Sequence, residues 1–382
     1  MEDDWLEDGA AIRDAIDAFA RRHLTAEYLA ECDRQARYPG EAMAALAADG
    51  WSTLPVTEEY GGTSASLMSL VAVHEALARH SLVVAQTYFS MWVLGADALA
   101  RLGTTAQQKH WLPLISKGSC LVAFALTEPD AGSDAAALRT SAVSSGGNYL
   151  VSGQKVFITG AAVSDVIVTA VRTRVGAKHA GISLLLIDPR SPGVTIRPLS
   201  KLGIKALDLC EVHFDGVEVP GENLLGTEDE GWAALRPGLA RERILLAGIA
   251  VGGLRDVLET CLAHAKTRES FGKTIGGHQL VAAKLVSMRV SLDAAKGLIA
   301  RAARLAAADR PDALVAAAEA KLFAADAYVT ATRDGIQVFG GYGYSEEYPL
   351  ARHYRDAKYL EIGGGTSEIQ TIVIARGMGL QV

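Results

Sequence analysis

Cysteine is scarce in this 382-residue chain, and its placement excludes two common kinds of structural support. The sequence has four cysteines, all far apart: Cys32, Cys120, Cys210 and Cys261. It contains no C-x-x-C pair and no Cys/His cluster with zinc spacing, so we expect neither a disulfide framework nor a metal site. The plain prediction is four buried free thiols in a reducing compartment.

Long apolar runs, targeting signals and an excess of positive charge are also missing. The longest apolar run, residues 244–254, is too short to span a bilayer. The acidic start, residues 1–5, lacks the features of a signal or transit peptide. The formal net charge of −7 provides no surface for a polyanion. We therefore expect a cytoplasmic protein that binds neither membrane nor nucleic acid.

What the chain does contain is three successive segments of different periodicity. Up to about residue 120, apolar residues recur at the spacing of amphipathic helices. Residues 121–228 are rich in β-branched residues separated by Gly, Pro, Asn and Asp, as in a small antiparallel barrel or sandwich. From 229 to 382 the pattern is helical again, and many alanines allow close packing in a bundle. These patterns predict an α+β fold with three domains, 1–120, 121–228 and 229–382.

The stretch AFALTEPDAGSD, residues 123–134, is the first candidate site. A short apolar strand leads into a loop that Pro129 and Gly132 punctuate and that is rich in hydroxyls and carboxylates. Such a loop can hold a polar ring edge or a phosphate with its backbone N–H groups. An ordinary surface turn has the same composition, so composition alone leaves both interpretations open.

Three motifs favour the interpretation of this loop as a binding site. LTEPDAGSD (126–134) resembles the flavin-contacting signature of the acyl-CoA dehydrogenase family, GQKVFITG (153–160) resembles its second flavin-facing strand, and QVFGGYGY (337–344) resembles its C-terminal signature. They keep the family's order and spacing, and the similarity covers nearly the whole chain. The resemblance implies an N-terminal helical domain, a middle β domain and a C-terminal four-helix bundle. It also implies FAD between the last two domains, and a homotetramer with a dimer as the alternative.

The resemblance also implies a reaction with a carboxylate base. The family removes a proton from the carbon α to a thioester and passes a hydride from the β carbon to flavin N5. In most members the base is a Glu directly before the Gly-Thr of a C-terminal loop, but the matching run here, EIGGGTSE (361–368), has Gly364 at that position. The run ARERILL (240–246) is similar to the isovaleryl-CoA and long-chain branches, which carry the base on this helix. Glu242 is therefore the predicted catalytic residue, and its apolar neighbours should raise its pKa.

Two points stay open around this loop. Glu242 could instead form ion pairs on a solvated helix face, with Glu361 or Glu368 as weaker candidates for the base. Gly363 and Gly364 replace an aromatic residue and the usual Glu, which suggests a wider pocket for a branched or bulky acyl group. The alternative is that these glycines only permit a tight loop with positive φ.

The remaining site residues are assigned through the resemblance. Expected contacts with FAD are Phe124, Leu126, Thr127, Ser133, Phe157, Ile158, Thr159, Arg268, Phe271, Gln279, Gln337, Gly341, Thr366 and Glu368. Expected contacts with substrate are Ser133, Arg243, Gly363 and Gly364. Arg268 lies in RESFGK (268–273), which resembles the motif whose Arg binds the FAD pyrophosphate of a neighbouring subunit with bidentate donors.

The predicted function is FAD-dependent α,β-dehydrogenation of an acyl thioester, carried on CoA or on a carrier protein. Electrons would pass to an electron-transfer flavoprotein or to oxygen. A helix-borne base with a small loop residue also resembles the flavoproteins that oxidise prolyl groups on carrier proteins. The alternatives are a flavin monooxygenase or oxidase on the same fold, and a flavin-free scaffold.

Overall fold

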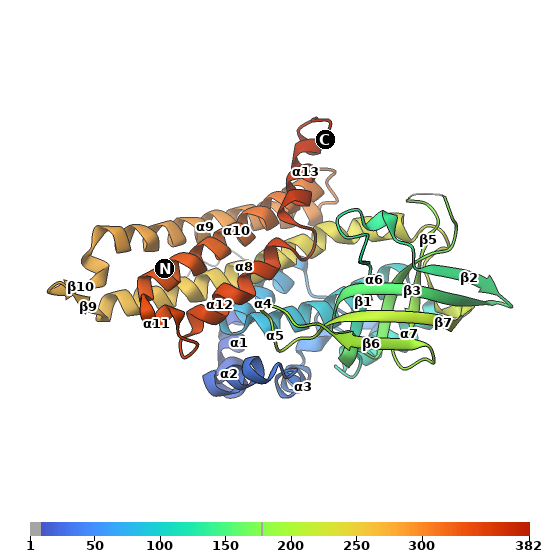
Figure 1. The fold of residues 1–382 in the computed structure, drawn as a ribbon, viewed down its shortest axis with the longest axis horizontal. Helices are drawn as coiled ribbons and strands as arrows, with labels where there is room; N and C mark the ends of the chain where they lie inside the picture. The colour runs from blue at the N-terminus through green and yellow to red at the C-terminus, as the bar shows by residue number, and fades with distance from the viewer. Residues whose placement is uncertain (1–8, 177–178) are drawn as a thin grey trace.

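The computed structural model describes residues 9–176 and 179–382, which form three blocks in chain order (Figure 1). The first block is helical: α1 (Gly9–His23), α2 (Ala26–Gln35), α3 (Gly40–Ala48), α4 (Leu67–His80), α5 (Leu82–Tyr88), α6 (Leu94–Leu102) and α7 (Thr105–Ser116). Side-chain caps explain where several of these helices begin. The hydroxyl of Ser66 accepts from the Ser69 N–H at the start of α4, and Thr104 with Gln107 forms a capping box at α7.

A π turn, Phe89–Val93, joins α5 to α6 and makes one helical stretch from Leu82 to Leu102. This stretch has the length and hydropathy of a membrane span, but 83% of its apolar window is buried inside the protein. Its side chains therefore pack against protein, as in a core helix. Turns of the π type inside α-helices are often found at functional sites.

The second block is one eight-stranded sheet with the order β6-β7-β3-β2-β4-β5-β8, and β1 pairs with β4. Its strands are β1 (Val122–Ala125), β2 (Ser141–Ser145), β3 (Asn148–Thr159), β4 (Val166–Arg172), β5 (Ile182–Ile187), β6 (Val194–Pro198), β7 (Leu209–Pro220) and β8 (Leu224–Leu225). Most neighbours are antiparallel, as predicted, but β1 and β2 each pair in parallel with β4, so the sheet is mixed. This pairing brings the end of β1, where the candidate loop begins, into the middle of the sheet.

The third block is a helical bundle built on three long helices, α8 (Gly231–Thr267), α9 (Gln279–Ala307) and α10 (Ala313–Phe339). Shorter elements complete it: the hairpin β9 (Glu269–Ser270) and β10 (Lys273–Thr274), α11 (Gly341–Tyr344), α12 (Pro349–Ala357) and α13 (Ser367–Gly377). Helix α8 is buried from Arg243 to Leu254 because it packs against both α10 and α4. The predicted fold class, with a helical domain, a β domain and a helical bundle, is confirmed.

Two features of the whole molecule bear on the site. The sheet and the β9–β10 hairpin lie at opposite ends of the long axis, and α8 runs between them (Figure 1). One apolar core joins the two helical blocks and one face of the sheet, and a second core lies within the β domain. All four cysteines are buried and free, as predicted, and the reducing compartment stays a prediction.

Candidate active site

Helix α8 holds Glu242 one residue before its buried segment begins. The carboxyl group is only partly accessible, and its pKa is raised because burial disfavours the charged form. The positive charges of Arg243 and Lys321 oppose this rise without cancelling it. Arg243 is buried, and within the described chain its Nε and Nη1 atoms have no hydrogen-bond partner. Glu242 is therefore not a solvated surface residue, and its surroundings suit a proton acceptor.

The loop that lacks the usual Glu lies directly beside Glu242. A Cβ added to Gly364 would be 3.4 Å from Glu242 Oε1 and would overlap Leu246 Cδ1. The helix thus delivers a carboxylate to the place that the loop leaves without a side chain. Gly364 also has φ of 65°, a conformation that favours glycine.

The same geometry argues against a wider pocket at these two glycines. A Cβ on Gly363 would lie 2.6 Å from Cζ of Tyr359, so the tyrosine ring already fills the space on that side. Leu246 occupies the corresponding space at Gly364. The room left by the missing aromatic and acidic side chains is thus taken up by other residues of this chain.

Two buried side chains that the sequence analysis missed hold this loop by its carbonyl groups. Lys321 Nζ donates to the Gly365 carbonyl at 2.7 Å. Gln370 Nε2 donates to the carbonyls of Gly365 at 2.8 Å and Gly364 at 3.2 Å. Burial lowers the pKa of Lys321 to about 8, with Arg243 acting in the same direction and Glu242 against it. A Lys among the alanines of α10 and a Gln among the aliphatic residues of α13 carry no sequence signal for this role.

The predicted flavin-facing residues come from two segments that are tied together. The Val156 N–H donates to the Thr127 carbonyl at 3.0 Å, which joins β3 to the loop after β1. Lys155, fully buried, donates to the Leu126 carbonyl at 3.0 Å and pairs with Glu128 at 2.8 Å. Glu128 also accepts from the backbone N–H groups of Arg139 and Thr140. These bonds hold the LTEP segment against β3, while Ser133, further along the same loop, is exposed.

Phe157 gives this region an open aromatic face. Its side chain is 59% exposed, its φ is 61°, and it lies where the β3–β7 register breaks between Lys155 and Ile158. An aromatic side chain held out of the core in a left-handed conformation fits a planar ring system such as flavin. Thr127, Phe124 and Leu126 are partly accessible, whereas Ile158 is buried in the core of the β domain. Any contribution of Ile158 to cofactor binding must therefore come from its main chain.

Tyr359 connects these residues to the base. Its hydroxyl accepts from Gln86 Nε2 at 3.1 Å, and the side chain of Thr159 at the end of β3 lies near it. Burial raises the pKa of Tyr359, and the charge of Glu242 raises it further. The flavin-facing strand, the loop glycines and the base therefore meet around one tyrosine ring.

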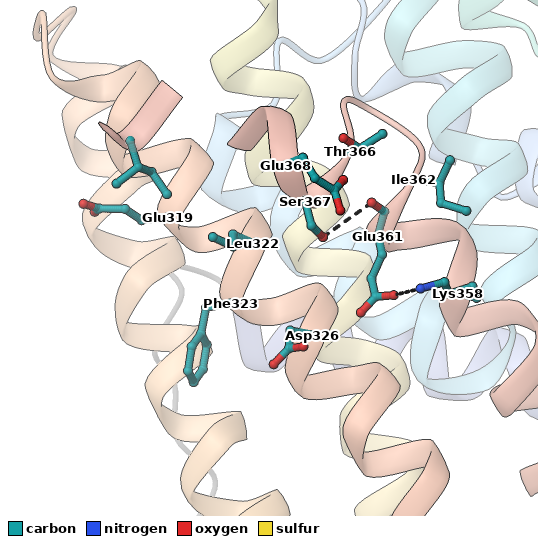
Figure 2. A pocket seen from close by; sticks show the side chains of 11 residues that line it. Glu319, Leu322, Phe323, Asp326, Lys358, Glu361, Ile362, Thr366, Ser367 and Glu368 are labelled. Atoms are coloured by element: carbon teal, nitrogen blue, oxygen red, sulfur yellow. Dashed lines mark hydrogen bonds and ion pairs between the residues drawn. The ribbon is translucent and has the colours of Figure 1, made fainter. Parts of the chain in front are cut away.

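A cavity of about 590 Å³ lies on the other side of the loop, between α10 and the start of α13 (Figure 2). Its wall includes Thr366, which caps α13 by accepting from the Ile369 N–H, and Glu368 in the first turn of that helix. The other lining residues are Glu319, Leu322, Phe323, Asp326, Lys358, Glu361, Ile362, Ser367 and Ile374. Glu361 forms an ion pair with Lys358, so this carboxylate is engaged in the cavity wall (Figure 2). With four carboxylates and one lysine, the cavity suits a neutral group with hydrogen-bond donors better than a phosphate.

The remaining predicted cofactor residues lie at the far end of the bundle. Arg268 directly follows α8, with its guanidinium 5.7 Å from the centre of the Tyr342 ring. Phe271, in the turn of the β9–β10 hairpin, is 94% exposed, and Gln279, Gln337 and Gly341 are exposed at helix ends nearby. Within one chain this group is separated from β3 by the length of the bundle (Figure 1). The structure therefore brings the predicted residues together in two groups, not one.

Metal ligands are not gathered at either place. In residues 9–176 and 179–382, no group of three or more His, Cys, Asp or Glu side chains could hold a metal ion.

Together, the fold and this site define a flavoprotein of the oxidoreductase class: a β domain with an open aromatic face, set against a helix that carries a half-buried carboxylate. Comparison with known proteins gives the family. Three domain descriptions match: acyl-CoA dehydrogenase N-terminal domain at residues 7–119, middle domain at 123–217 and C-terminal domain at 229–379. The chain belongs to the acyl-CoA dehydrogenase family and is an acyl-CoA dehydrogenase-type oxidoreductase.

Individual relatives span the whole chain. A probable acyl-CoA dehydrogenase of Bacillus subtilis, YngJ, is 36% identical over 367 residues, which is 96% of each protein. Butyryl-CoA dehydrogenase of Megasphaera elsdenii has a similar structure, with a TM-score of 0.94, 32% identity and full coverage of both chains. PigA in complex with FAD and proline also has a similar structure, with a TM-score of 0.94, 28% identity and full coverage of both chains. The prolyl acyl carrier protein oxidase AnaB has a TM-score of 0.93 and 28% identity, over 98% of this chain and 99% of AnaB.

Proposed function

We propose that this protein catalyses α,β-dehydrogenation of an acyl thioester with FAD as its cofactor and Glu242 as the base. The observation that carries the proposal is the position of the Glu242 carboxylate, 3.4 Å from where a side chain would begin on Gly364. The helix and the loop complement each other, since one supplies the carboxylate that the other lacks.

The chain's own residues account for the proton step. Glu242 removes the proton from the carbon α to the thioester, and its raised pKa makes it a stronger base than an ordinary carboxylate. The buried guanidinium of Arg243 beside it, with two unpartnered donors, limits the cost of the negative charge before the proton arrives. FAD, when bound, would supply the acceptor for the hydride that leaves the β carbon, so that one carbon–carbon double bond forms.

The residues around Phe157 would hold the ring of FAD, and those around Arg268 would hold the phosphates of FAD in another subunit. The two groups lie at opposite ends of one chain, and several apolar side chains at the hairpin end are uncovered. This arrangement supports the proposal of a homotetramer, or of a dimer, in which chains complete each other's sites. An electron-transfer flavoprotein is the proposed electron acceptor, and oxygen is the alternative.

The test is an anaerobic titration of the FAD-loaded protein with straight, branched and cyclic acyl-CoA thioesters, followed by the loss of oxidised-flavin absorbance. We expect bleaching in the wild type and a rate about a hundredfold to ten-thousandfold lower in Glu242→Gln. Glu361→Gln is the matched control, because its carboxylate is engaged by Lys358 in the wall of the separate cavity. Equal bleaching in wild type and a folded, flavin-bound Glu242→Gln protein would contradict Glu242 as the base.

A further inference from the structure

Helix α5 carries a buried glutamine in an otherwise mostly apolar stretch. Gln86 is 1% exposed, and its Nε2 atom donates to Ser90 Oγ at 2.8 Å and to Tyr359 Oη at 3.1 Å. Its Oε1 atom has no hydrogen-bond partner among the residues that the structure describes. A buried acceptor left without a donor is costly, so its retention calls for an explanation.

Tyr359 presents the complementary group beside it. Its oxygen accepts a hydrogen bond from Gln86 Nε2, which leaves its own proton for another partner. The raised pKa keeps the hydroxyl protonated, and the residue stays partly accessible. Gln86 and Tyr359 therefore offer one free acceptor and one free donor next to each other.

This pair faces the reacting part of the site and not the outer surface. The Tyr359 hydroxyl is 2.8 Å from where a Cβ would stand on Gly363, the neighbour of the glycine that adjoins Glu242. The π turn that follows Gln86 packs at the end of β3, where a Cβ on Gly160 would overlap Met91 Sδ. Tyr359 thus lies near both the base and Thr159, one of the residues expected to contact FAD, and Gln86 is hydrogen-bonded to it.

We infer that Gln86 and Tyr359 form a polar subsite for the acyl group, and that the substrate carries a hydroxyl or neutral amine close to its reacting carbons. Such a group donates to Gln86 Oε1 and accepts from the Tyr359 hydroxyl at the same time. An unsubstituted alkyl chain satisfies neither atom, and a site built to hydrogen-bond a substrate group discriminates strongly against the analogue without it. The inference rests on the proposed function and names the substrate class of the same site.

The experiment compares isosteric thioesters that differ in one polar group. One pair is 4-hydroxybutyryl-CoA with pentanoyl-CoA, and the other is the prolyl with the cyclopentanecarbonyl thioester of pantetheine. The second-order rate constant for anaerobic flavin bleaching is measured for each. We expect one of the two polar thioesters to react with the wild type at least about tenfold faster than its apolar partner. The pair that shows this preference tells whether the site recognises a hydroxyl or an amine.

Two variants test the subsite, and a third is the matched control. Gln86→Met and Tyr359→Phe keep the volume and should each reduce the preference for the polar member about tenfold, with the apolar member affected little. Thr87→Val removes the hydroxyl of the neighbouring buried residue, which bonds only to the Val83 carbonyl of its own helix, and should leave the preference unchanged. The dissociation constants of the unsaturated products, measured by calorimetry, should follow the same order.

Faster reaction of both apolar members in the wild type would overturn the polar subsite and leave the dehydrogenase proposal intact. A preference unchanged in both Gln86→Met and Tyr359→Phe would do the same. If no thioester bleached a flavin that light and a chemical donor can still reduce, the proposed function would fail, and the inference with it.

Discussion

At the scale of single residues, the site keeps a carboxyl group where its charged form is disfavoured. The pKa of Glu242 is raised by burial, in spite of Arg243 and Lys321 nearby. The proposed function needs the ionised form of Glu242, whereas the folded state would be more stable without that charge. Such conflicts between local stability and role are expected at active sites.

The first prediction concerns the stability of Glu242→Gln. Since the folded-state pKa of Glu242 is raised, its contribution to stability is present below the ordinary pKa of a glutamate and is lost as pH rises through the raised value. At neutral pH the variant should therefore be more stable than wild type, by about 1.4 kcal/mol for each unit by which the pKa is raised. Denaturant unfolding between pH 4 and 8 measures this, with the exposed Glu27→Gln as control. If the gain in stability of Glu242→Gln did not shrink towards pH 4, the raised pKa of Glu242 would not be its cause.

The second prediction concerns the loop glycine. Gly364→Ala places a side chain at φ of 65° and against Leu246, so it should lower the free energy of unfolding by about 1–2 kcal/mol. Gly132→Ala is the control, because an added Cβ at that glycine would meet no neighbour within 4 Å and its φ is not positive. Chemical denaturation of the two variants should separate them clearly, and equal stability would show that the loop adapts.

At the scale of elements, the cofactor loop is fixed to the sheet by one buried ion pair. Burial alone would raise the pKa of Glu128, but Lys155 and the N–H groups of Arg139 and Thr140 bring it below its usual value. The pKa of Lys155 is lowered to about 8 by burial, which Glu128 partly offsets. Each partner therefore depends on the other to stay charged inside the β domain.

The third prediction follows from this pair. Lys155→Met leaves the Glu128 carboxylate buried without its cation and should cost about 3–5 kcal/mol of stability. It also frees the Leu126 carbonyl, so flavin should be retained less well on gel filtration. The double variant Lys155→Met/Glu128→Gln should recover part of the loss in unfolding experiments. No recovery would mean that Lys155 acts through packing and not through its charge.

The sequence predicted the elements more fully than the contacts between them. Apolar periodicity was enough for the helices and strands, and motif resemblance singled out Thr127, Phe157 and Glu242, whose roles in binding and catalysis stay predictions. Gln86, Lys321, Tyr359 and Gln370 were missed, because they reach the site from three helices and one 3₁₀ turn that are distant in the chain. Ile158 shows the opposite limit: alternation along β3 turns its side chain into the core although its motif resembles a cofactor contact.

At the scale of the molecule, the residues predicted to contact the cofactor are divided between two ends. The hairpin end exposes Phe271 and, on α9, Leu280, Val286 and Val290, at 61–94% of their surface. Apolar side chains gathered on one region of a surface mark an interface, and here they accompany Arg268. The proposed homotetramer or dimer would use both.

The fourth prediction uses this division. Arg268→Ala should weaken flavin binding about tenfold, and Arg268→Ala and Glu242→Gln homo-oligomers should both lose thioester-dependent bleaching. Co-expressed with different tags and purified as mixed oligomers, the two variants should regain activity, because one subunit supplies Glu242 and its neighbour Arg268. Light scattering should give a molecular mass that is a multiple of the 40.3 kDa of one chain. Mixed oligomers without activity would place Arg268 and Glu242 in the same site of one chain.

With the proposed base on α8 and not on the loop, catalysis and substrate choice depend on different segments of the chain. In the proposed function the reactive group belongs to α8, the longest helix of the described chain, while the glycine loop, with Leu246 and Tyr359 packed against it, shapes the space around that group. Mutations in the loop can therefore alter which molecules are accepted while the proposed base stays in place on α8. A lineage built this way can explore new substrates at little risk to its chemistry, which makes the same segment the natural target for directed evolution.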